Sequence, residues 1–183
     1  MKRLISIIVA AALVAVLFCG CSPDNKKGSG DKLSIVTTIF PSYDFAKQIG
    51  GDKADVTMLL KPGMESHSYD PTPQDIIKIQ ECDLFIYVGG ESDHWVKDIL
   101  DSDKEKPKKV IALMDCVDTV TEETVEGMTE DEHEEKDSDE VEYDEHVWTS
   151  PGNAITISKK IAGSMKELSP SDASVFEKNL NSY

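Results

Sequence analysis

The sequence has 183 residues, of which 39% are hydrophobic and 30% are charged. This length corresponds to one domain, or to one domain and part of a second, and the composition excludes wholesale disorder. The formal net charge of -16 excludes a protein that binds nucleic acid through a basic face. Most of this charge lies in residues 118–145, which contain 15 carboxylates and one lysine. We therefore interpret the chain as an ordinary globular domain with one acidic insert.

Residues 1–20 have the pattern of a signal peptide. Two basic residues precede an apolar run, 4–18, which is shorter than the roughly 20 residues that a membrane span requires. The run ends in Phe-Cys-Gly-Cys, which resembles a bacterial lipobox with Cys21 as the lipidated residue. An ordinary cleaved signal peptide with incidental cysteines is the alternative. We expect the polar segment 21–32 to be a lipidated tether, which would anchor the chain to the cell membrane, facing the extracellular surface or the periplasm.

From residue 33 onward, strand-like and helix-like segments alternate. Apolar and β-branched runs predict strands at 33–38, 56–60, 84–88 and 109–113. Start signals and apolar spacing predict helices at 42–49, 73–81, 94–100 and 151–168. This order predicts an α/β fold, with a parallel sheet and helices on both faces. Ligands of such sheets bind beyond the carboxyl ends of the strands.

The same segments suggest how the chain is organised. We expect an α/β domain over 33–168, interrupted by the acidic insert 118–145 as a mobile loop. In the helix 151–168, apolar spacing predicts four core residues, Ile155, Ile161, Ala162 and Met165. A last helix begins near residue 169 and has no capping residue before the sequence stops at 183. This pattern is typical of a chain cut within a helix.

The four histidines are the candidates for metal chemistry. His67 lies in a loop bounded by Pro and Gly directly after a predicted strand, and His146 lies where the acidic insert meets the next helix. Each is either a metal ligand or a structural surface residue; we expect Trp148 to be buried and to fix the position of His146. His133, within the acidic run, is a weaker candidate, and His94 is typical of an exposed helix start.

The sequence contains no motif of an enzyme active site. HExxH, CxxC, Gly-x-Ser-x-Gly and phosphate-binding glycine loops are all absent, and no nucleophile is paired with a base. We therefore predict that the protein is not an enzyme. Cys82 and Cys116 either form a disulfide, which an extracytoplasmic location permits, or remain two separate thiols.

Two motifs together are more specific than any single residue. Residues 62–73 (Pro-Gly-Met-Glu-Ser-His-Ser-Tyr-Asp-Pro-Thr-Pro) and 144–151 (Asp-Glu-His-Val-Trp-Thr-Ser-Pro) resemble the metal-binding receptors of zinc and manganese ABC importers, the ZnuA-like and AdcA-like family. The apolar strand ending in Gly-Gly at 84–90 and the strand at 35–41 also match. The resemblance covers about residues 33–183.

The resemblance implies two α/β lobes joined by a long helix, with a metal ion held between the lobes. It places the two histidine ligands of the N-terminal lobe at His67 and His146. Glu65, two positions before His67, and His133, within the acidic run, are secondary candidates from their positions in the sequence. The other ligands would come from a second lobe that is missing here, since 169–183 align with the start of the connecting helix. The implied protein is a monomeric lipoprotein that captures Zn²⁺ and delivers it to an ABC transporter permease.

The candidate ligands and the acidic insert both bear on which metal the site binds. Zinc prefers imidazole and thiolate ligands in a four-coordinate shell, which suits His67 and His146. In zinc receptors of this family the loop before the second histidine is usually rich in histidine, whereas here it is rich in carboxylates, which also hold manganese. A manganese or iron(II) receptor is therefore the first alternative, and a surface adhesin with a structural metal, acting in cell adhesion, is the second.

Overall fold

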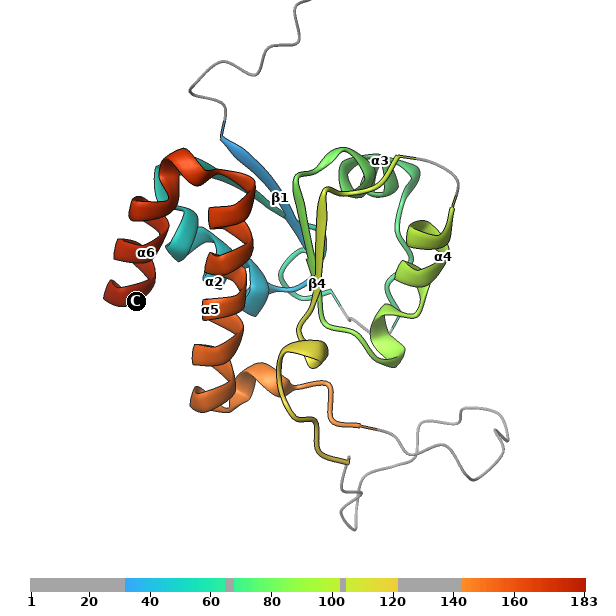
Figure 1. Ribbon diagram of the computed structural model, residues 1–183. Coiled ribbons are helices and arrows are strands. Elements are labelled where there is room, and N and C mark those ends of the chain that lie inside the picture. The colour runs from blue at the N-terminus through green and yellow to red at the C-terminus, as the bar shows by residue number, and fades with distance from the viewer. Residues whose placement is uncertain (1–31, 65–67, 103–104, 122–142) are drawn as a thin grey trace, which may run out of the picture. The chain divides into compact units, whose positions relative to one another are not determined.

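The computed structural model in Figure 1 describes residues 32–64, 68–102, 105–121 and 143–183. From Lys32 onward the chain forms one compact unit. The predicted signal peptide and the lipidation site Cys21 lie outside the described residues. Within the described ranges, no helix has both the length and the apolar character needed to cross a membrane.

A four-stranded parallel sheet lies at the centre of this unit. Its strands are β1 (Leu33–Thr37), β2 (Ala54–Met58), β3 (Leu84–Tyr87) and β4 (Lys109–Ala112). They are arranged in the order β2-β1-β3-β4, and every neighbouring pair is parallel. The predicted parallel α/β sheet is therefore confirmed.

Helices cover both faces of the sheet (Figure 1). They are α2 (Phe40–Gly50), α3 (Pro73–Glu81), α4 (Trp95–Asp101), α5 (Pro151–Leu168) and α6 (Ala173–Ser182). Successive strand residues point to opposite faces. Accordingly, Ile35 and Leu84 belong to the apolar cluster under α2, α5 and α6, whereas Val36 and Phe85 belong to the cluster under α3 and α4.

Helix α5 has the predicted bounds, but one of its predicted core residues is wrong. Ile161, Ala162 and Met165 are fully buried, whereas Ile155 is 56% exposed. Residues four positions apart share one face of a helix, so the buried series that ends in Ile161 and Met165 begins at Ile157. Ile155 lies two residues before Ile157, on the opposite side of the helix.

The C-terminal helix α6 packs against α2 and α5. Phe176 is fully buried in the cluster that these helices share. The side-chain amide of Asn179 donates a hydrogen bond of 3.0 Å to the carbonyl oxygen of Ile49, near the end of α2. Since the last carbonyls of a helix lack partners within it, this bond joins the two helices and satisfies one such group.

The two ends of the acidic insert are paired with each other. Thr121 and Tyr143 form an antiparallel bridge, and the backbone N–H of Asp144 donates to the carbonyl oxygen of Val120 at 2.9 Å. The interior of the insert, 122–142, lies outside the described residues. The predicted mobile loop therefore begins and ends at a common point.

The two cysteines of the domain are separate thiols. Cys82 is buried and Cys116 is partly buried, and neither forms a disulfide. Each sulfur donates to a nearby backbone carbonyl, that of Ile79 at 3.1 Å and that of Ala112 at 3.3 Å. Burial raises the pKa of the Cys82 thiol to about 12, so this sulfur is unreactive near neutral pH.

The contrast between two isoleucines of α5 tests the packing of this helix. Ile157→Ala should lower the free energy of unfolding by about 2–5 kcal/mol, because it leaves a cavity under the sheet. The matched control Ile155→Ala should change it by less than about 0.5 kcal/mol, because that side chain is exposed. Urea denaturation of the two variants measures both values; equal losses would contradict the described orientation of α5.

Candidate metal centre

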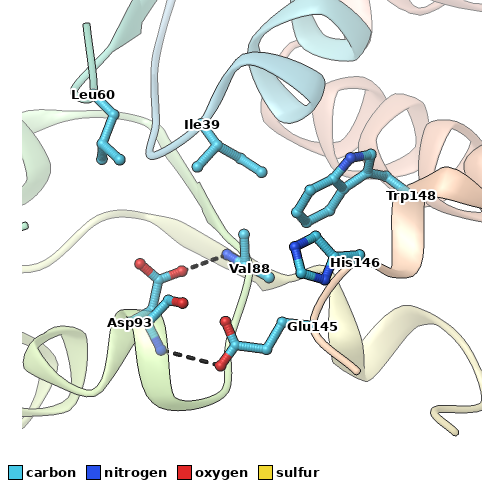
Figure 2. A pocket seen from close by; sticks show the side chains of 8 residues that line it. Ile39, Leu60, Val88, Asp93, Glu145, His146 and Trp148 are labelled. Atoms are coloured by element: carbon cyan, nitrogen blue, oxygen red, sulfur yellow. Dashed lines mark hydrogen bonds between the residues drawn. The ribbon is translucent and has the colours of Figure 1, made fainter. Parts of the chain in front are cut away.

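A pocket lies at the carboxyl edge of the sheet, where ligands of parallel sheets bind. Ile39, Leu60 and Val88, which follow β1, β2 and β3, line one part of it. The turn after β3 and the segment before α5 supply the remaining residues, which are Ser92, Asp93, Glu145, His146 and Trp148. Figure 2 shows the side chains that line the pocket, which come from separate parts of the chain.

His146 is held in a defined orientation by Asp144. One carboxylate oxygen, Oδ1, accepts the backbone N–H of His146 at 2.8 Å and lies 2.9 Å from its ring Nδ1. Because a carboxylate only accepts hydrogen bonds, this contact assigns a proton to Nδ1, and Nε2 of the neutral ring is then the free lone pair. These hydrogen bonds lower the pKa of Asp144. A carboxylate behind an imidazole is typical of metal-binding histidines.

The residues after His146 attach it to the core. Val147 is buried in the cluster under α2 and α5, and it begins a short 3-10 helix, Val147–Thr149. Trp148 is only half-buried, so the prediction of a buried tryptophan is met in part. Its ring lies 5.5 Å from the ring of His146. Burial of Val147 therefore fixes the backbone, and Trp148 packs beside the imidazole.

Two carboxylates that the sequence did not single out also line the pocket. Asp93 is buried, and its Oδ2 accepts the backbone N–H groups of Val88 at 2.7 Å and Gly89 at 3.2 Å. Burial, with a smaller contribution from the charge of Glu145, raises the pKa of Asp93 to about 6. Oε1 of Glu145 accepts the backbone N–H of Ser92 at 3.0 Å. The sequence feature that could have identified Asp93 is its position, since an acidic residue follows shortly after the Gly-Gly at the end of a buried strand.

The other candidates are placed differently. His67 and Glu65 fall in 65–67, and His133 falls in 122–142, so all three lie outside the described residues. His94 is the exposed N-cap of α4, as expected for a surface residue at a helix start. Among the described residues, no three His, Cys, Asp or Glu side chains come together as a metal site. The described part therefore contains one predicted ligand, His146.

The raised pKa of Asp93 predicts a specific pH dependence of stability. The ordinary pKa of 3.8 applies in the unfolded chain and a pKa of about 6 in the folded one, so between these values the folded state binds more protons. The free energy of unfolding should therefore fall by about 3 kcal/mol, relative to Asp93→Asn, as the pH rises through this window. Urea denaturation of both metal-free proteins from about pH 4 to pH 7 tests this; parallel curves would contradict it.

Comparison with known proteins identifies the family. A family model described as "Zinc-uptake complex component A periplasmic" matches residues 35–183. The zinc-binding lipoprotein AdcA of Streptococcus pneumoniae is 37% identical over 177 residues, which are 96% of this chain and 34% of AdcA. The high-affinity zinc uptake system protein ZnuA of Bacillus subtilis is 37% identical over 184 residues, 96% of this chain and 55% of ZnuA. The chain thus spans about a third to a half of these relatives.

Solved structures agree with this assignment. Zn(II)-bound AdcA of Streptococcus pneumoniae matches with a TM-score of 0.65 and 34% identity, over 84% of this chain and 30% of that one. A Mn-bound periplasmic metal binding protein from Candidatus Liberibacter asiaticus matches with a TM-score of 0.64 and 28% identity, over 83% and 52% of the chains. These relatives are named for metal binding and uptake and not for an enzymatic activity. The chain belongs to the ZnuA family of zinc-uptake components.

Proposed function

We propose that this protein is an extracytoplasmic receptor that captures Zn²⁺ and delivers it to an ABC transporter permease. The observation that carries the proposal is the orientation of His146 at the pocket. Asp144 binds Nδ1 at 2.9 Å, which leaves Nε2 as the ligand atom. The ring is exposed, so a metal ion can reach it without rearrangement of the core.

His67 is the proposed second ligand. Its support is the course of the chain, because Leu60, seven residues before it, lines the same pocket as His146. Tyr69, two residues after it, packs against Trp95 with ring centroids 5.6 Å apart. The chain is thereby attached to the domain both before and after the loop that contains His67. Glu65 is kept as a secondary ligand.

The remaining ligands are proposed to come from a second lobe. Two imidazoles supply half of a four-coordinate zinc shell, and the chain covers only 34% of AdcA and 55% of ZnuA. In this proposal 169–183 begin the helix that leads to the second lobe. Ligands divided between two lobes let the affinity for metal depend on the arrangement of the lobes, which a receptor needs in order to release its cargo.

Zinc is the proposed cargo, with manganese as the second candidate. AdcA and ZnuA are named for zinc, and imidazole is a good zinc ligand. Manganese is retained because one structural relative was solved with it bound. His133 and the carboxylates around it are proposed to collect cations near the site, since a dense negative charge raises their local concentration.

Removing the two proposed ligands tests this function. In a competition titration of the full-length protein against a zinc chelator, His146→Ala and His67→Ala should each weaken zinc binding by about 100-fold or more, since even loss of a residue behind a ligand costs about 10- to 100-fold. The control His94→Ala should bind zinc normally, because His94 is an exposed helix cap. Unchanged affinity in both ligand variants would refute the site. The same titration with Mn²⁺ decides between the two metals.

The proposed lipid anchor has its own test. Cys21→Ser should move the protein from the membrane fraction to the soluble extracytoplasmic fraction and abolish labelling with a radioactive fatty acid, because a thioether-linked lipid requires this sulfur. The matched control Cys19→Ser should remain labelled and membrane-bound, since bulky Phe18 precedes Cys19 whereas small Gly20 precedes Cys21. Membrane retention of the Cys21 variant would contradict the assignment.

A further inference from the structure

We propose that Glu145 is a positioning residue for His146. In this role it attaches the segment before α5 to the turn after β3, so that the imidazole is in place before the metal arrives. The inference rests on the proposed function, because it takes His146 as a ligand. It assigns to Glu145 no contact with the metal.

The carboxylate of Glu145 occupies a space that only a glycine leaves open. Its Oε1 accepts the backbone N–H of Ser92 at 3.0 Å, and Figure 2 shows the side chain directed at this turn. Gly90 has a φ of +72°, and a Cβ at this position would lie 2.7 Å from Cδ of Glu145. Any other residue at position 90 would be strained and would displace the carboxylate.

The turn that Glu145 binds is itself held by hydrogen bonds to a buried carboxylate. Asp93 accepts the backbone N–H groups of Val88 and Gly89 and is buried. On the other side of His146, Val147 is buried in the core. His146 is thus held from both directions, by Glu145 through the turn and by Val147 through the core. A ligand that is already ordered loses less conformational entropy when it binds.

The alternative role of Glu145 is purely electrostatic, with its negative charge attracting cations to the pocket. Two substitutions separate the roles. Glu145→Gln keeps the length of the side chain and an oxygen that accepts the N–H of Ser92, but removes the charge. Glu145→Asp keeps the charge, but its shorter side chain withdraws the oxygen from that N–H.

Zinc competition titrations of the full-length variants provide the first measurement. If Glu145 positions His146, Glu145→Ala and Glu145→Asp should weaken binding by about tenfold, and Glu145→Gln should restore most of the affinity. The control Asp118→Ala, which removes an exposed carboxylate at the other end of the insert, should bind as the unmodified protein does. If Glu145→Gln loses affinity for zinc while Glu145→Asp binds zinc fully, the positioning role is overturned and the electrostatic role is supported.

A second measurement needs no metal. Trp148 lies 5.5 Å from the His146 ring, so its ring current shifts the imidazole proton resonances in NMR spectra of the metal-free protein. These shifts should persist in Glu145→Gln and move toward free-histidine values in Glu145→Ala; unchanged shifts in Glu145→Ala would overturn the positioning role. These results also distinguish failure of the positioning role from failure of the proposed function. If His146 is not a ligand, His146→Ala binds zinc normally, whatever the imidazole shifts of the Glu145 variants are.

Discussion

The burial of β3 on both of its faces determines how the pocket is built. Leu84 and Phe85 are fully buried, yet they belong to different apolar clusters, and Val88, directly after the strand, is buried as well. A buried backbone N–H needs a hydrogen-bond partner within the protein. The Asp93 carboxylate accepts the buried N–H of Val88 and the partly buried N–H of Gly89, and this carboxylate beside the pocket is therefore a consequence of how the sheet ends.

The ends of the buried strands and the turn after β3 together explain how an apolar sheet carries a polar site. The strand ends fix Ile39, Leu60 and Val88, and the turn after β3 then supplies backbone groups for a carboxylate from a distant part of the chain. His146 itself lies in a connecting segment, where binding residues are common. The ring of His146 is exposed to solvent, yet its backbone is fixed, because Val147 is buried in the core and Glu145 is hydrogen-bonded to the N–H of the buried Ser92.

Local patterns in the sequence predicted the fold well. Every strand and helix predicted between residues 33 and 168 exists within two residues of its expected bounds, because apolar periodicity and capping signals act over short distances. The last helix, expected from about residue 169, begins at Ala173 after a short 3-10 helix, Pro170–Asp172. The prediction that Ile155 is a core residue was wrong, because apolar character alone does not say which side of a helix faces the sheet. Glu145 was missed for another reason, since its partner Ser92 lies 53 residues away in the chain. Four further site residues fall outside the described residues, so their roles stay predictions: Cys21, Glu65, His67 and His133.

The bridge between Thr121 and Tyr143 has a consequence for variation among related sequences. Because the chain leaves and re-enters the domain at one point, the number of residues between these two positions has little influence on the residues around them. Doubling the length of a flexible loop costs only about 0.6 kcal/mol in closure entropy. This position can therefore accept segments of different length and composition without a change in the geometry of the imidazole beside it.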